Sequence, residues 1–320
     1  MKELDRLYWL YPERTRFEND PTAWENYRRS AKLARFELEA ISVDDVEIVF
    51  DGHESWVYVK GERVDPGRTL FHNKLETWPQ FQKDVWRFLS TFQALESSGH
   101  CTLIRSAQNL LTTDKISTLM ELGRIGGVRT IPTLNIPTRD FAVLRTKPDD
   151  VGIDYPVIVK PAHWGSGRGV VRAHDEGQLI MALRLASAAE LTMVVQPMLG
   201  AGGTLTDVRV MCVDQRPALS AVRHLGPNKT VNNSGGGGRT EIVPVPEDLV
   251  APATEIAERI GTPWIGVDFL YDGSDYHLCE VEIDAYIPKS WMESPEMARV
   301  LDLRFASYRR RFDLWLEAKS

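Results

Sequence analysis

The sequence GVDFLYDGSDYHLCEVE, residues 266–282, decides the fold that we predict for this chain. Two apolar runs flank Asp272-Gly273-Ser274-Asp275, and Gly, Asp and Ser are the residues that close hairpin loops. We therefore expect an antiparallel β-hairpin. With Gly273-Ser274-Asp275 as the loop, Asp268 pairs with Glu280, and Glu282 lies on the same face because side chains alternate along a strand.

This predicted hairpin places three carboxylates together. Opposed Cβ atoms in such a pair are about 5 Å apart, and facing like charges are destabilising, so the cluster needs a counter-charge. A divalent cation would supply one. Because Mg²⁺ is typically held by one or two carboxylates and by phosphate oxygens, this interpretation also predicts a nucleotide site. The alternative is a solvent-facing strand with scattered acids, although both strands are otherwise apolar.

Composition limits the class of protein. The 320 residues are 43% hydrophobic and 26% charged, which is ordinary for a globular chain of two or three packed units. No apolar run approaches the roughly 18 residues of a membrane span, and the N-terminal residues are too charged for a signal peptide, so we expect a cytoplasmic protein. The three cysteines are far apart and predict free thiols. A net charge of −7 argues against nucleic-acid binding.

The first third of the chain alternates between helical and extended patterns. We predict helices over 20–40 and 78–97 and strands over 46–50, 56–59 and 101–105, which together indicate a small α/β domain. From Thr113 the pattern changes, and Thr113-Asp114 is a suitable cap for a helix that begins at Lys115. A long amphipathic helix is predicted from Met297 to Trp315.

A glycine-rich loop follows a short apolar strand over 155–161 that contains Lys160. The loop is Gly165-Ser166-Gly167-Arg168-Gly169, and a second strand follows it. Rossmann and P-loop fingerprints require a helix after the glycines, so neither fits. Glycine amides can form an anion nest, whereas a flexible hairpin loop is the alternative. Lys160 favours the first interpretation, because a lysine inside an apolar run needs an anionic partner.

A second hairpin is predicted where 206–213 returns as 218–223. With Asp214-Gln215-Arg216 as its loop, Asp207 faces Arg223 and Arg209 lies on the same side, whereas a two-residue turn would break this pairing. A surface ion pair is the alternative interpretation. The segment NKTVNNSGGGGR, 228–239, is either a linker or a lid over bound phosphate.

Taken in order, these segments resemble the ATP-grasp superfamily, in the branch of carboxylate–amine ligases that includes ribosomal-protein glutamate ligase and the lysine-biosynthesis ligases. The resemblance covers about 114–288. It is carried by Asp114-Lys115, PVIVKPAHWGSGRGV at 156–170, VVQPML at 194–199, Asp207-Val208-Arg209, Arg223, Asn233, Gly237-Gly238, GVDFL at 266–270 and CEVE at 279–282. The implied fold is an α/β (α+β) ATP-grasp fold. It would have a pre-grasp domain at 1–112, a central grasp subdomain at 113–193 and a C-terminal grasp subdomain at 194–320.

The resemblance also implies roles for individual residues. ATP would be bound by two lysines, a phosphate loop, a hinge against adenine and one aspartate: Lys115, Lys160, Gly165, Ser166, Gly167, Arg168, Gly169, Gln196, Pro197, Met198, Leu199 and Asp207. Asp268, Glu280 and Glu282 match the ligands of two Mg²⁺ ions, with Mn²⁺ as an alternative metal. Arg209 and Arg223 match catalytic arginines near the transferred phosphate and the acid substrate.

Three features depart from the pattern of the family. Glu282 stands where Asn is usual, which adds a negative charge to the metal site. Pro197 replaces an acidic residue of the hinge. The segment after Glu282, 283–288, lacks the usual Ser-Pro-Gly run.

The expected activity is an ATP-dependent ligation. A carboxylate does not react with an amine at neutral pH, so ATP would convert it to an acyl phosphate, and an amine would displace the phosphate. The substrates would be an amino acid or peptide carboxylate and an amine, with Arg209, Arg223, His72 and Lys74 suited to an anionic substrate. His163 and His224 are either bases or structural residues. A nucleotide-binding module without ligase activity and a kinase are the alternatives, and a homo-oligomer is left open.

Overall fold

The computed structural model describes residues 4–11, 21–137, 146–200, 205–224 and 239–320. Within these residues the strands form four sheets, three of them antiparallel and one parallel. The predicted α/β fold class is confirmed. The predicted segment 228–239 lies outside the described residues except for its last position.

The first part of the chain forms a parallel sheet with strand order β2-β1-β6-β7. Its strands are β1 (Asp5–Tyr11), β2 (Phe36–Ser42), β6 (Thr69–Asn73) and β7 (Cys101–Thr102), and its helices are α2 (Pro21–Leu33), α3 (Val85–Ser97) and α4 (Ser106–Thr113). A small antiparallel sheet, β3 (Val46–Phe50), β4 (Ser55–Val59) and β5 (Glu62–Arg63), is inserted between β2 and β6.

The helix predicted over 20–40 is too long. It ends at Leu33, and Arg35 has a positive φ of 63° that turns the chain into β2. Phe36 and Leu38 are buried on either side of the exposed Glu37, so the sequence here follows the two-residue period of a strand. Similarly, the helix predicted from 78 begins with the 3₁₀ segment Pro79–Asp84 before α3.

The middle of the chain forms a second sheet with strand order β10-β9-β11-β8. It contains α5 (Lys115–Leu122), β8 (Leu134–Ile136), β9 (Val157–Pro161), β10 (Val171–Ala173), α6 (Glu176–Ala188) and β11 (Met193–Pro197). The predicted order of strand, glycine loop and strand is confirmed, because β9 and β10 pair antiparallel around the loop. β11 spans the predicted boundary between 193 and 194, and the division into three domains stays a prediction.

The last part of the chain forms a five-stranded antiparallel sheet with strand order β14-β13-β12-β15-β16. Its elements are β12 (Thr206–Val213), β13 (Arg216–His224), β14 (Arg239–Val243), α7 (Glu247–Ile260), β15 (Trp264–Tyr271), β16 (Tyr276–Ile283) and α8 (Pro295–Glu317). Further 3₁₀ segments are Val43–Asp45, Pro66–Arg68, Asp149–Val151 and Lys289–Trp291.

Both predicted hairpins have the predicted pairings with different loops. β12 and β13 are joined by the two-residue turn Asp214-Gln215, whose φ angles are both positive, and an irregularity at Met211/Cys212 restores the pairing of Asp207 with Arg223. β15 and β16 are joined by four residues, 272–275, and a register shift after Asp268 restores its pairing with Glu280. In each hairpin a β-bulge offsets the one-residue difference in loop length.

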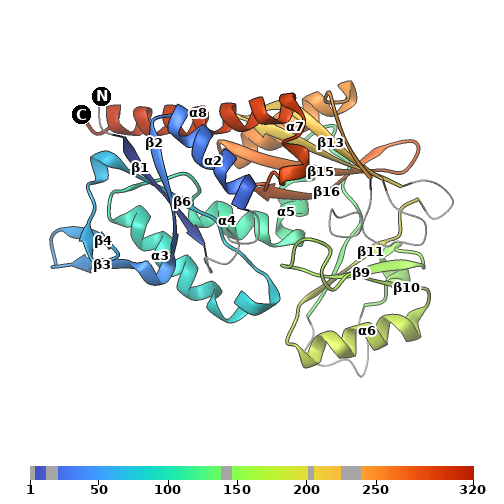
Figure 1. Cartoon of the computed structure of the whole chain (residues 1–320). Helices are drawn as coiled ribbons and strands as arrows, with labels where there is room; N and C mark the ends of the chain where they lie inside the picture. Colours follow the sequence, from blue (N-terminus) through green and yellow to red (C-terminus); the bar gives the residue numbers. More distant parts are fainter. Residues whose placement is uncertain (1–3, 12–20, 138–145, 201–204, 225–238) are drawn as a thin grey trace.

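Figure 1 shows α8 running along the top of the molecule, beside the N-terminal strands and the five-stranded sheet, with the middle sheet and α6 below. One hydrophobic core includes side chains of the parallel sheet, the five-stranded sheet and α8, whereas the middle sheet and α6 have a separate core. The middle sheet with α6 and the five-stranded sheet therefore pack around different cores. No helix of the described segments is long and apolar enough to cross a membrane.

Candidate active site

A network of arginines and carboxylates occupies one face of the five-stranded sheet. Cross-strand pairing places Asp207 beside Arg223, Arg209 beside Asp268 and Asp268 beside Glu280. Four of these residues are at most 9% exposed, namely Asp207, Arg209, Arg223 and Asp268. The alternative of a surface ion pair at Asp207 and Arg223 is therefore wrong.

Asp268 is the centre of this network. Its Oδ1 and Oδ2 accept hydrogen bonds from Arg209 Nε at 2.6 Å and Arg209 Nη2 at 2.7 Å. Arg223 Nη2 donates both to Asp268 Oδ2 at 2.8 Å and to Asp207 Oδ1 at 2.7 Å. Guanidinium groups thus supply the counter-charge that these acids need, whereas the sequence analysis considered only a divalent metal ion for this purpose.

The pKa values of the two aspartates move in opposite directions. Burial alone would raise the pKa of Asp268, but Arg209 and Arg223 hold it below its usual value. For Asp207, burial raises the pKa to about 7 against the opposing effect of Arg223, and the Asp268 carboxylate raises it further. The two side chains thus differ because Asp268 contacts two guanidinium groups and Asp207 contacts one.

Glu282 and Glu280 lie on the same strand but have different surroundings. Glu282 Oε2 is 2.9 Å from Arg209 Nη1, and its Oε1 is 3.0 Å from Lys74 Nζ, which comes from the segment after β6. The sequence argument grouped Lys74 with substrate-binding residues and did not predict this contact. Glu280 is half-buried and has no ion pair within 4 Å among the described residues.

Two lysines of the middle part of the chain face β16. Lys115 is 9% exposed and Lys160 is 8% exposed, and among the described residues no carboxylate lies within 4 Å of either ammonium. Lys115 Nζ donates to the carbonyl oxygen of Trp164 at 2.5 Å, and Lys160 Nζ lies 3.9 Å from Cys279 Sγ. Burial lowers the pKa of Lys115, while the charge of Glu280 acts in the opposite direction. The structure therefore brings both predicted lysines to the edge of the acidic face.

The glycine loop turns sharply beside these lysines. Ser166 and Gly167 have positive φ angles of 59° and 68°, and Gly169 has a φ of 69°. A Cβ atom at Gly169 would lie 2.8 Å from Pro161 Cγ, so this position requires glycine for space as well as for conformation. Arg168 places its guanidinium 4.0 Å from the centre of the Trp78 ring, which brings the loop against the N-terminal part of the chain.

The predicted adenine hinge begins at the end of β11. Gln196 is 3% exposed, and its Nε2 donates to Thr133 Oγ1 at 2.8 Å. Pro197, Met198 and Leu199 are half-buried, and the Met198 amide donates to the Pro156 carbonyl at 3.0 Å. Their contact with adenine stays a prediction.

The histidines have separate environments. His72 is 1% exposed, its Nε2 lies 3.2 Å from Asp284 Oδ1, and its ring stacks on Trp9 at 3.8 Å. It is therefore enclosed in the core and does not line a substrate site as its residue type suggested. His163 is half exposed and lies 3.0 Å from Asp114 Oδ2, which also caps α5 by accepting from the Ser117 amide.

The predicted metal site includes two neighbouring carboxylates. Among the described residues no three His, Cys, Asp or Glu side chains are gathered as a metal-binding group. Asp268 and Glu280 are nevertheless direct cross-strand neighbours, and Glu280 has carboxylate oxygens without an ion pair in the described segments. The carboxylate oxygens of Glu280 fit Mg²⁺ that is also bound to phosphate oxygens, whereas both oxygens of Asp268 are bound by arginines.

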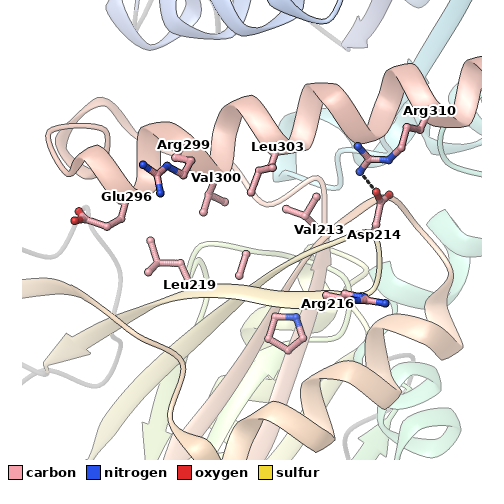
Figure 2. A pocket seen from close by; sticks show the side chains of 11 residues that line it. Val213, Asp214, Arg216, Leu219, Glu296, Arg299, Val300, Leu303 and Arg310 are labelled. Atoms are coloured by element: carbon pink, nitrogen blue, oxygen red, sulfur yellow. Dashed lines mark hydrogen bonds and ion pairs between the residues drawn. The ribbon is translucent and has the colours of Figure 1, made fainter.

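A cavity of about 590 Å³ lies elsewhere, between α8 and the turn of the β12–β13 hairpin (Figure 2). Its lining includes Val213, Leu219, Val300 and Leu303, and Arg310 pairs with Asp214 at its edge. None of the predicted site residues lines this cavity.

Comparison with known proteins identifies the family. A model described as the RimK-like ATP-grasp domain matches residues 130–294, which is just over half of the chain. The chain belongs to the RimK-like ATP-grasp family. The resemblance deduced from the separate motifs is confirmed, and the lysines, the glycine loop and most of the acidic face of this RimK-like protein lie within or just before the matched segment.

Related proteins extend the comparison. A coenzyme γ-F420-2:α-L-glutamate ligase of Methanococcus maripaludis is 26% identical over 197 residues, which cover 61% of this chain and 66% of that ligase. The chain thus spans just under two thirds of this relative. A structure of the ATP-grasp ligase PsnB with minimal precursor, Mg and ADP has a TM-score of 0.64 at 16% identity, over 96% of this chain and 99% of the other. A D-alanine–D-alanine ligase of Bacillus anthracis with ATP has a TM-score of 0.66 at 12% identity, over 99% and 100%. The predicted ATP-grasp fold is confirmed.

Proposed function

We propose that this RimK-like ATP-grasp protein is an ATP-dependent ligase that joins a carboxylate to an amine through an acyl phosphate. The observation that carries this proposal is the pair of buried lysines, Lys115 and Lys160, which lack a carboxylate partner in the described part of the chain. A buried ammonium needs a negative partner, and the glycine loop beside them can offer amides to the same anion. A nucleotide phosphate supplies that partner.

The proposal assigns a role to each group of site residues. Lys115, Lys160 and the loop at 165–169 bind phosphate, residues 196–199 contact adenine, and Asp207 keeps Arg223 in place for the nucleotide. Glu280 would hold Mg²⁺, which when bound neutralises phosphate oxygens, and its cross-strand neighbour Asp268 stays a predicted ligand. The structure of the ATP-grasp ligase PsnB with Mg and ADP supports Mg²⁺ as the metal that accompanies the nucleotide. A second metal ion and Mn²⁺ as a substitute stay predictions.

The chemistry requires charge neutralisation and positioning. A substrate carboxylate oxygen attacks the γ-phosphorus of ATP, the bond to the β,γ-bridging oxygen breaks, and ADP leaves. An amine then attacks the acyl carbon, loses a proton to solvent or a base, and expels inorganic phosphate. Arg209 and Arg223 are the catalytic arginines in this proposal, because fixed guanidinium groups can stabilise the charge that develops on phosphate and carboxylate oxygens.

The substrate class is an amino acid or a peptide. The related coenzyme γ-F420-2:α-L-glutamate ligase and the structure of PsnB with its minimal precursor support this choice. The buried network of Arg209 and Arg223 favours an anionic carboxylate substrate. The cytoplasmic location and the oligomeric state stay predictions.

The test measures ADP release by purified protein with Mg-ATP and a panel of amino acids and short peptides, with hydroxylamine as the trapping amine. We expect ADP release that depends on a carboxylate, and a hydroxamate that forms from the acyl phosphate. Transfer of phosphate to an acceptor without hydroxamate would indicate the alternative kinase. Binding of Mg-ATP with no turnover across the panel would favour a nucleotide-binding module, and no binding at all would refute the nucleotide site.

A further inference from the structure

Glu282 is held from two sides by cations of different parts of the chain. Lys74 Nζ is 3.0 Å from Glu282 Oε1, and Arg209 Nη1 is 2.9 Å from Glu282 Oε2. The side chains of Lys74 and Arg209 are 10% and 9% exposed, whereas that of Glu282 is 31% exposed. Both carboxylate oxygens of Glu282 therefore have a charged partner.

The backbone on both sides of Lys74 is held by contacts that do not involve Glu282. Asn109 Nδ2 donates to the Asn73 carbonyl at 3.0 Å, and Asn109 Oδ1 accepts from the Leu75 amide at 2.7 Å. One buried amide side chain thus holds the residues on both sides of Lys74. Because the chain is already ordered there, the ion pair with Glu282 needs little further ordering of the backbone.

The strand end that contains Glu282 is fixed by a second contact of the same kind. His72, two residues before Lys74, pairs with Asp284, two residues after Glu282, at 3.2 Å. Two ion pairs, His72 with Asp284 and Lys74 with Glu282, therefore join the end of β6 to the end of β16. This correspondence makes Lys74–Glu282 part of a fixed junction between the N-terminal sheet and the five-stranded sheet.

On the other side, Glu282 contacts the third nitrogen of the Arg209 guanidinium. Asp268 binds Nε and Nη2 of the guanidinium, and Glu282 binds Nη1. Gly266, which pairs with Glu282 across the sheet, leaves the space that this geometry needs. A Cβ atom at Gly266 would lie 3.4 Å from Arg209 Cδ and 2.8 Å from Ala285 Cβ.

We propose that Glu282 is a positioning residue, which orients the catalytic Arg209 from the fixed Lys74, and that it is not a metal ligand. To bind a metal, Glu282 would have to give up charge-assisted contacts on both oxygens, whereas Glu280 has no ion pair to give up among the described residues. This inference rests on the proposed function for the role of Arg209, but the Lys74–Glu282 contact can be tested without nucleotide.

The metal-binding part is tested by counting bound Mn²⁺ by electron paramagnetic resonance in the presence of AMP-PNP. We expect Glu282→Gln to bind the same number of ions per chain as the wild type, and Glu280→Gln to lose at least one. Loss of one Mn²⁺ per chain in Glu282→Gln would overturn the inference. If the wild type bound no Mn²⁺ with the nucleotide, the proposed function would fail instead.

The positioning part is tested with a double-mutant cycle and kinetics. In metal-free protein, Lys74→Met and Glu282→Gln should each lower the melting temperature by several degrees, and the double variant should fall by less than the sum. In the hydroxamate assay each single variant should lower kcat by about tenfold or more with little change in KM for ATP, since a displaced Arg209 affects the reaction more than binding.

Arg29→Met provides the matched control, because Arg29 on α2 pairs with Asp302 on α8 at 2.9 Å away from the site. It should change neither kcat nor the Mn²⁺ count. Additive losses in the metal-free cycle, or single variants with wild-type kcat, would refute the positioning role. Coupling in the metal-free cycle would support the Lys74–Glu282 contact even if the ligase activity itself were not found.

Discussion

Two arginine–aspartate networks at the five-stranded sheet use the same residue types in different ways. Arg304 on α8 is 0% exposed and pairs with Asp284, while its Nε donates to Tyr308 Oη at 2.7 Å and its Nη1 to Tyr27 Oη at 3.2 Å. Its guanidinium also lies 4.9 Å from the centre of the Trp9 ring. Every side of this arginine is occupied by protein, as expected of a structural network.

The second network, around Arg209 and Asp268, is incomplete at its edge. Beside it lie Glu280 without an ion pair and the two lysines Lys115 and Lys160 without a carboxylate partner, all judged over the described residues. Burial and residue type alone therefore do not distinguish a structural network from a ligand-binding site. Charges that the protein itself leaves unpaired indicate where a charged ligand binds.

Arg304→Met should have the largest effect on stability. It leaves the carboxylate of Asp284 buried without its arginine, which typically costs about 3–5 kcal/mol. Urea unfolding measures the change, and Arg310→Met on the same helix is the control, since its pair with Asp214 is more exposed and such pairs contribute about 1 kcal/mol or less. A loss below about 1 kcal/mol for Arg304→Met would mean that the first network is not structural.

Glu280→Gln should affect turnover strongly and the free energy of unfolding little. Because Glu280 has no ion pair among the described residues, stability should change little, whereas turnover should fall by about 100-fold or more through loss of a metal ligand. Turnover in the hydroxamate assay and urea unfolding check the two parts. Glu258→Gln, on the exposed side of α7, should leave both unchanged. Wild-type turnover in Glu280→Gln would remove the distinction between the two networks.

The sequence predicted the pairings of the site better than the loops that connect them. Asp268 with Glu280 and Asp207 with Arg223 are correct, although both loop lengths differ by one residue from the prediction. The alternation of apolar and charged residues determines which face a strand buries, so a slip of register would bury the wrong set. A β-bulge in each hairpin compensates for the one-residue difference in loop length. No simple pattern in these residues predicts a bulge.

Contacts between distant segments could not be predicted in this way. Lys74 and Glu282 are separated by 208 residues, and their ion pair depends on the packing of β6 against the end of β16. The same applies to Arg304, which is enclosed by aromatic rings from three other segments and from α8 itself. Local patterns predict elements, whereas these contacts depend on tertiary packing.

His100 lies outside both networks and should give the smallest effect near neutral pH. Burial lowers its pKa to about 4 from an ordinary value of 6.5, so the unfolded chain binds a proton there that the native chain does not. The contribution is therefore fully present above pH 6.5 and is lost as the pH falls toward 4. Urea unfolding as a function of pH should show a weaker slope in this window for His100→Gln, and an unchanged slope would contradict the assignment.

The most direct test of the central claim is the affinity for AMP-PNP with Mg²⁺, measured by calorimetry for Lys160→Met. The control is Lys147→Met, because Lys147 lies in the same part of the chain but is half exposed and pairs with Glu176 at 3.0 Å. The account predicts that Lys160→Met weakens binding by about 100-fold, as expected for loss of a buried charge contact, while Lys147→Met binds like the wild type. Equal affinity of Lys160→Met and the wild type would contradict the claim that the unpaired buried lysines form the nucleotide site.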